Sequence, residues 1–117
     1  MPTINASFRE TFATVRGLLE ANAKGLMVHV DKPGEFEMCS TELVDREGRP
    51  LFVAAVRIKK NYVSFHLIPV YAFSELLQEM SPSLRKRMQG KSCFNFTTID
   101  PALLKELRAV TKKALLN

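Results

Sequence analysis

Four segments with the pattern of β-strands, joined by short connections, constrain the fold of this chain more than any other feature. Apolar residues alternate with polar ones in Leu26 to Val30 and again in Glu35 to Thr41, and Pro33-Gly34 predicts a turn between these two segments. A third segment, Leu51 to Lys59, and a fourth, Tyr62 to Ile68, follow after short connections. Because a parallel crossover needs about a dozen residues or more, these connections predict antiparallel neighbours.

Helical periodicity appears on both sides of these segments. Apolar residues at helical spacing predict a helix over about residues 7–23. After the fourth strand, two short helices are expected, the second beginning at Ser81-Pro82 with Ser as the N-cap. A fifth strand, Cys93 to Thr97, precedes a final helix that begins at Asp100-Pro101. The predicted order is α-β-β-β-β-α-α-β-α.

This order predicts an α+β fold, a two-layer sandwich in which helices cover one face of a mainly antiparallel five-stranded sheet. The 117 residues fit a single domain, residues 1–117, with one core. Hydrophobic residues make up 46% of the chain and charged residues 25%, a composition that excludes wholesale disorder.

The net charge of +5 is unevenly distributed along the chain. Residues 1–58 hold seven Lys and Arg against eight Asp and Glu, whereas residues 59–117 hold ten against four. A basic second half can attract anionic partners, but it carries no information about fold or specificity.

Cysteine usage and hydropathy indicate an intracellular protein. Cys39 and Cys93 are 54 positions apart without a CxxC spacing, so we expect reduced thiols and a cytoplasmic location. The longest apolar run, Leu51 to Val56, is too short to span a bilayer, and the first residues lack a targeting pattern. No membrane association is predicted.

Alternation along the strands sorts the side chains into two sets, one for each face of the sheet. The set expected to lie beneath the helices is Leu26, Val28, Val30, Phe36, Met38, Phe52, Ala54, Val56, Ile58, Val63, Phe65, Leu67, Phe94 and Phe96. The complementary set is Met27, His29, Asp31, Glu37, Cys39, Val53, Ala55, Arg57, Tyr62, Ser64, His66, Cys93 and Asn95. Both histidines and both cysteines belong to this second set.

This segregation has three interpretations. The first is a solvated sheet face without a site, and the second is a face used in homodimer formation. The third is a shallow pocket floored by Val53 and Ala55, suited to a small anionic or aromatic ligand. The candidate ligand-binding residues are Arg57, Tyr62, His66, Lys91 and Cys93.

Catalytic and metal-binding patterns are incomplete in the sequence. Cys93 as a nucleophile with His66 as its base is conceivable, but no oxyanion site can be identified, and no catalytic residue is assigned. His29, His66, Cys39 and Cys93 are suitable zinc donors, but they fall on four strands without a short-spaced pair. No metal and no cofactor are predicted.

A basic stretch and an acidic stretch of the sequence are candidate binding sites. The basic segment Arg85 to Lys91 suits phosphate contacts, but no aromatic residue is interleaved with it, and nucleic acid is not an expected partner. The segment Gln89 to Ser92 lacks the first glycine of a P-loop. The acidic residues between Glu35 and Glu47 suggest either a hard-cation site or a charged surface hairpin.

Three runs and a closing helix give a family resemblance over about residues 51–117. The runs are Phe52 to Val56, Tyr62 to Leu67, and Gly90 to Phe96. Together they resemble the YdhG-like domains of unknown function, some of which carry iron-chaperone or frataxin-like labels. The resemblance implies a small intracellular α+β domain and, by family analogy, an iron-chaperone function.

We therefore expect a non-enzymatic binding or interaction module, which binds a small ligand or a second subunit through its polar sheet face. The alternatives are an enzyme that uses His66 and Cys93, a nucleic-acid-binding protein that uses Arg85 to Lys91, and an iron chaperone.

Overall fold

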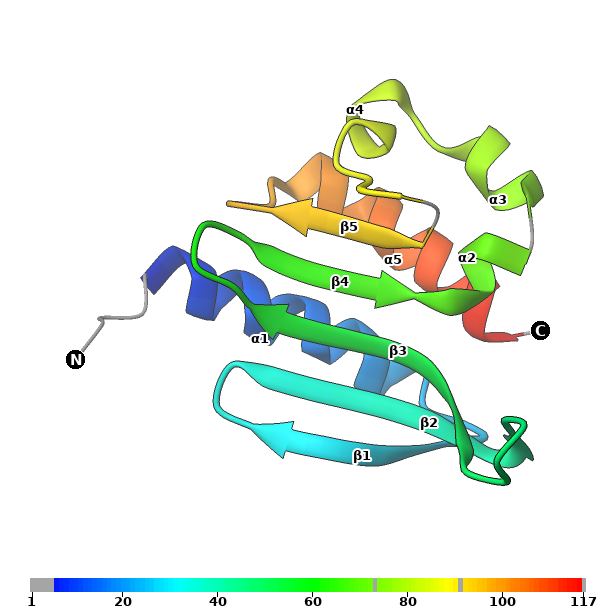
Figure 1. Cartoon of the computed structure of the whole chain (residues 1–117). Coiled ribbons are helices and arrows are strands. Elements are labelled where there is room, and N and C mark those ends of the chain that lie inside the picture. Colours follow the sequence, from blue (N-terminus) through cyan, green and yellow to red (C-terminus); the bar gives the residue numbers. More distant parts are fainter. Residues whose placement is uncertain (1–5, 73, 91, 117) are drawn as a thin grey trace.

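The computed structural model describes residues 6–72, 74–90 and 92–116, and Figure 1 shows how its elements are arranged. The elements are α1 (Ala6–Ala21), β1 (Leu26–Lys32), β2 (Glu35–Val44), β3 (Pro50–Ile58), β4 (Val63–Leu67), α2 (Ile68–Ala72), α3 (Ser74–Glu79), α4 (Pro82–Arg85), β5 (Cys93–Phe96) and α5 (Pro101–Leu116). The five strands form one sheet in the order β1-β2-β3-β4-β5, with every neighbouring pair antiparallel. The predicted α+β class and order of elements are confirmed.

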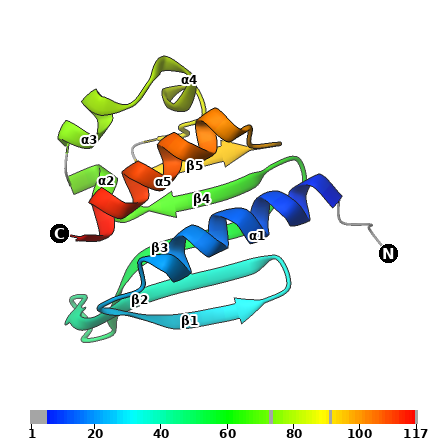
Figure 2. The same ribbon diagram turned by 180° about the vertical axis from the view of Figure 1, so that it is seen from behind.

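The two long helices lie on the same side of the sheet. Figure 2 shows α1 and α5 crossing this side, while α2 continues from the tip of β4, and α3 and α4 lie on the β5 side of the sheet. The opposite side of the sheet faces the viewer in Figure 1, and none of the described helices crosses it. The fold therefore has two layers, with one sheet face left uncovered by the helices.

The core lies between the sheet and the two long helices. Buried residues of α1 and α5 recur at the helical spacing predicted for an apolar stripe. They are Phe12, Val15, Leu18, Leu19, Leu103, Leu107, Val110 and Ala114. Against them pack Phe65, Phe94 and Phe96, whose rings stack in succession with centroids 6.1 and 6.3 Å apart. Full burial of each such side chain stabilises the fold by roughly 1.5–3 kcal/mol.

The hairpin between β1 and β2 forms as the sequence predicts. Lys32 pairs with Glu35, so Pro33 and Gly34 make up the whole connection. Gly34 adopts a φ of 78°, a conformation that a side chain would strain. Proline followed by glycine at positive φ is the combination typical of a type II turn.

The segment after α4 protects the outer edge of β5. Ser81 is the N-cap of α4, because its hydroxyl accepts a hydrogen bond from the Leu84 amide at 3.2 Å. Leu84 is fully buried in the core. The chain then runs along β5, where the Asn95 amide donates to the Arg87 carbonyl at 2.7 Å and the Gln89 amide to the Cys93 carbonyl at 2.8 Å. The β5 backbone therefore has partners on both sides.

An irregularity in β1 exchanges two residues that alternation assigned to the other face. The pairing with β2 shifts between Val28 and Val30, so Val30 lies opposite Glu37 and Asp31 lies opposite the buried Phe36. A bulge reverses the side-chain direction beyond it, because the side-chain period of a strand is two. Asp31 therefore lies on the helix side, where both of its carboxylate oxygens accept hydrogen bonds from Arg16 of α1.

A second irregularity, between β2 and β3, exchanges Phe52 and Val53. Cys39 pairs with Phe52, while Met38 pairs with Ala54, so Val53 is the additional residue. Val53 packs against the hydrophobic core, and Phe52 lies on the side of Arg57, whose guanidinium carbon is 6.0 Å from its ring centroid. The predicted placement of these two residues is therefore wrong, and Val53 does not floor a pocket on the polar face.

No helix within the described ranges combines the length and the apolar character needed to cross a membrane.

Candidate functional site

Two lines of paired residues run across the uncovered side of the sheet, and together they define what we call the open face. The first line is Lys32, Glu35, Arg57, Ser64 and Asn95, one residue from each strand in sheet order. The second line is Val30, Glu37, Ala55, His66 and Cys93. The open face therefore holds three of the predicted site residues, Arg57, His66 and Cys93.

Arg57 is held by two carboxylates of the neighbouring strand. Its Nε lies 3.3 Å from a Glu35 oxygen, and its Nη2 donates to Glu37. The side chains of Arg57 and Glu37 are only 21% and 16% exposed, so this pair is screened less by solvent than a surface ion pair. The charge of Arg57 is thus balanced within the protein, and an anionic ligand would compete with both carboxylates.

His66 and Cys93 lie directly opposite each other on β4 and β5. The Cys93 Sγ is 3.6 Å from the His66 Nε2, and it is 3.7 Å from the Asn95 Oδ1. Both residues are half-buried, so solvent still reaches the pair. The sequence prediction that His66 and Cys93 share a face is confirmed.

The surroundings favour the uncharged forms of both side chains. Burial raises the pKa of the Cys93 thiol, and the positive charges of Arg57 and Lys59 offset only part of this effect. Burial also lowers the pKa of His66, and the same two positive charges lower it further. At neutral pH the pair is therefore a thiol beside a neutral imidazole, not a thiolate beside an imidazolium.

The centre of the open face is closed by its longer side chains. Ala55 is fully buried and Ser64 is 2% exposed, although neither lies beneath a helix. The Ser64 hydroxyl has no hydrogen-bond partner among the described residues. A buried hydroxyl without a partner costs about 1–3 kcal/mol, so the structure retains an unused polar group at this position.

The other predicted site residues do not lie beside Arg57, His66 and Cys93. Tyr62 is half-buried in the turn before β4, where its carbonyl accepts a hydrogen bond from the Lys59 amide at 2.7 Å. Lys91 lies outside the described residues. His29 is exposed at the β1 irregularity, and Cys39 is buried opposite Phe52. In the described part of the chain, no three His, Cys, Asp or Glu residues are placed to hold a metal ion.

Part of the basic segment Arg85 to Lys91 makes contacts within the fold. The Arg85 guanidinium donates to the carbonyl of Leu77 in α3, with its Nε at 2.8 Å. Lys86 and Arg87 are exposed, but the Arg87 carbonyl pairs with β5. Arg85 therefore secures the end of α3, and its guanidinium is held by this contact while it keeps its positive charge.

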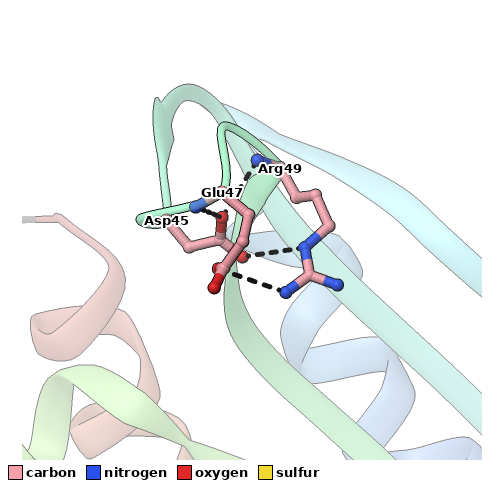
Figure 3. A network of polar contacts seen from close by, with 3 residues as sticks. All are labelled: Asp45, Glu47 and Arg49. Atoms are coloured by element: carbon pink, nitrogen blue, oxygen red, sulfur yellow. Dashed lines mark hydrogen bonds and ion pairs between the residues drawn. The ribbon is translucent and has the colours of Figure 1, made fainter.

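Two carboxylates of the hairpin between β2 and β3 share one guanidinium. Asp45 accepts hydrogen bonds from the Glu47 and Arg49 amides at 2.9 and 3.0 Å, and the Arg49 guanidinium lies within 3.3 Å of both carboxylates (Figure 3). The hydrogen bond from the Arg49 amide is the main cause of a lowered pKa at Asp45. These contacts support a charged surface hairpin, in which Asp45 and Glu47 are already engaged by Arg49.

Sequence reasoning missed a cavity of about 550 Å³ at the end of the sheet where β2 ends and β3 begins. Its lining comes from β1, β2, β3, α2 and α5 and includes Leu26, Leu43, Leu51, Val53, Ile68 and Leu115. Each of these residues belongs to an ordinary apolar pattern, so only the topology brings them together.

Comparisons of the chain with protein-family models, with curated proteins and with solved structures find no match.

Proposed function

We propose that this protein is a non-enzymatic binding module that engages a second subunit or a small ligand through its open face. The observation that carries the proposal is the pair of residue lines across a sheet side that the described helices leave uncovered. Their polar and reactive side chains stand on regular strands, which hold them in fixed relative positions.

The charge pattern favours a second protein chain over an isolated anion. The open face carries two cations, Lys32 and Arg57, and two carboxylates, Glu35 and Glu37. A second protein chain can meet this mixture of cations and carboxylates with opposite charges of its own, whereas a small anion must displace Glu35 or Glu37 from Arg57. A second subunit is therefore the partner that this surface suits best.

An enzyme that uses Cys93 and His66 is the second candidate, because the two side chains are in contact. Nucleophilic catalysis needs a thiolate, and burial acts against it by raising the pKa of Cys93. The neutral pair is better suited to binding than to attack on a substrate.

The remaining alternatives have less support in the structure. Nucleic-acid binding through Arg85 to Lys91 would compete with the contact between Arg85 and the Leu77 carbonyl. The YdhG-like resemblance and its iron-chaperone function stay predictions. A cytoplasmic location is part of our proposal and is supported by the free thiols of Cys39 and Cys93.

Native mass spectrometry of freshly purified protein tests the proposal, because it reports subunit number and bound molecules together. We expect a dimer or a retained small molecule, and we expect Asn95→Arg to abolish it by placing a long cation on the open face. Ala109→Arg on the exposed side of α5 is the matched control and should leave the complex intact. A bare monomer at every protein concentration, or equal effects of both variants, would refute the proposal.

A further inference from the structure

The distance between the Cys93 Sγ and the His66 Nε2 is that of a hydrogen bond between a thiol and an imidazole, and it also matches the spacing of two ligands on one zinc ion. Zinc binds sulfur at about 2.3 Å and imidazole nitrogen at about 2.05 Å. With these bond lengths, the observed separation of 3.6 Å between Sγ and Nε2 corresponds to an S–Zn–N angle of about 110°. This is the tetrahedral angle, whereas a linear two-coordinate ion would hold the two atoms about 4.3 Å apart.

We propose that Cys93 and His66 form half of a tetrahedral zinc site, which the same two residues of a second copy of the chain complete. The inference rests on the proposed function, because it assigns the second subunit as the partner of the open face. This site does not use His29 and Cys39, the other two zinc donors present in the sequence.

The donor set explains why a second copy is needed. No third His, Cys, Asp or Glu joins the pair within the described residues, and the nearby Asn95 Oδ1 is a neutral amide oxygen. Zinc in structural sites takes four ligands, usually thiolates and imidazoles. Two copies supply two thiolates and two imidazoles, and the two negative charges neutralise the ion.

The surface around the pair permits such an approach. Cys93 and His66 lie on the open face and are half-buried, so neither residue is sealed from solvent. The open face carries both cations and carboxylates, so a copy related by a twofold axis can place opposite charges together. A twofold axis through the metal ion would place each Cys93 and His66 pair opposite its counterpart.

Proton release accompanies binding. The Cys93 thiol transfers its proton to solvent as the sulfur–zinc bond forms, whereas His66 binds through the Nε2 lone pair of the neutral ring. Protons therefore compete with zinc, and apparent affinity should rise with pH up to the pKa of the thiol.

Titration of the metal-free protein with ZnCl₂, followed by native mass spectrometry and analytical ultracentrifugation, tests the inference. We expect one zinc ion per two chains, with a dimer that dissociates when a chelator is added. Cys93→Ser and His66→Gln should each weaken zinc-dependent dimerisation at least tenfold, while Cys39→Ser should leave it unchanged. Replacement of zinc by Co²⁺ should give the strong visible absorption of a tetrahedral site with sulfur ligands.

Three outcomes would overturn the inference: no retained zinc, one zinc ion on a monomer, or zinc-dependent dimerisation that survives Cys93→Ser. These results are separable from failure of the proposed function. A dimer that forms in chelator and is lost in Asn95→Arg preserves the proposed function without the metal. A protein that is monomeric and ligand-free with and without zinc contradicts both.

Discussion

Replacement of Leu84 by alanine measures how strongly the short helix α4 is anchored to the core. Leu84 is fully buried among core residues although α4 has only four residues. Buried Leu→Ala changes cost about 2–5 kcal/mol, and we expect about 3 kcal/mol because a short surface helix can partly collapse into the space. For a chain of 117 residues, the unfolding entropy is about 0.25 kcal/mol/K, so Tm should fall by about 12 °C.

Urea denaturation followed by circular dichroism gives the free energy of unfolding for this comparison. Leu43→Ala is the matched control, because Leu43 is 61% exposed and its truncation should change stability by no more than about 0.5 kcal/mol. The slope of free energy against urea should be unchanged in both variants. A Leu84→Ala cost below about 1 kcal/mol, or equal to that of Leu43→Ala, would show that α4 is not part of the core.

Three further predictions concern individual side chains. Because the pKa of His66 is lowered in the folded state, the unfolded state binds a proton at higher pH than the folded state does. The free energy of unfolding should therefore be at its full value above about pH 6.5 and decline below it. His66→Gln should reduce this decline, measured by urea denaturation between about pH 7.5 and 5.5. Asp31→Asn should cost only about 0.2–1 kcal/mol in the same assay, since the Asp31 side chain is 51% exposed, and a cost above 2 kcal/mol would contradict this assignment. Because burial raises its pKa, Cys93 in a Cys39→Ser background should react with iodoacetamide more slowly at pH 8 than a free thiol, and a faster reaction would favour the nucleophile hypothesis.

The sequence was sufficient for the parts of the sheet whose pairing is uninterrupted. From Ala54 to Ile58, β3 pairs with β4 without a shift, and β4 pairs with β5 in the same way. Alternation therefore placed Arg57, His66 and Cys93 correctly on one face. The contact between His66 and Cys93 was not predictable, because it depends on which residues of two separated strands stand opposite each other.

The two bulges could not be read from the sequence. Phe52 to Val56 is apolar at every position, so either register buries an equally hydrophobic set, and alternation gives no signal of the shift. In β1 the shift places Asp31 beside Arg16, a pairing that only the docking of α1 makes apparent. The Asp45, Glu47 and Arg49 network likewise depends on the shape of a turn that composition alone leaves open.

The strand pairing between β4 and β5 bears directly on both proposals. Directly opposite residues of antiparallel strands hold their Cβ atoms about 4.5–5.5 Å apart, so the backbone alone brings His66 and Cys93 within reach of a common ligand. The segment along the outer edge of β5 gives this strand a second set of hydrogen bonds, which limits its movement. A partner or metal ion would therefore meet a pair that is already in place, and little of the binding energy would be spent on ordering it.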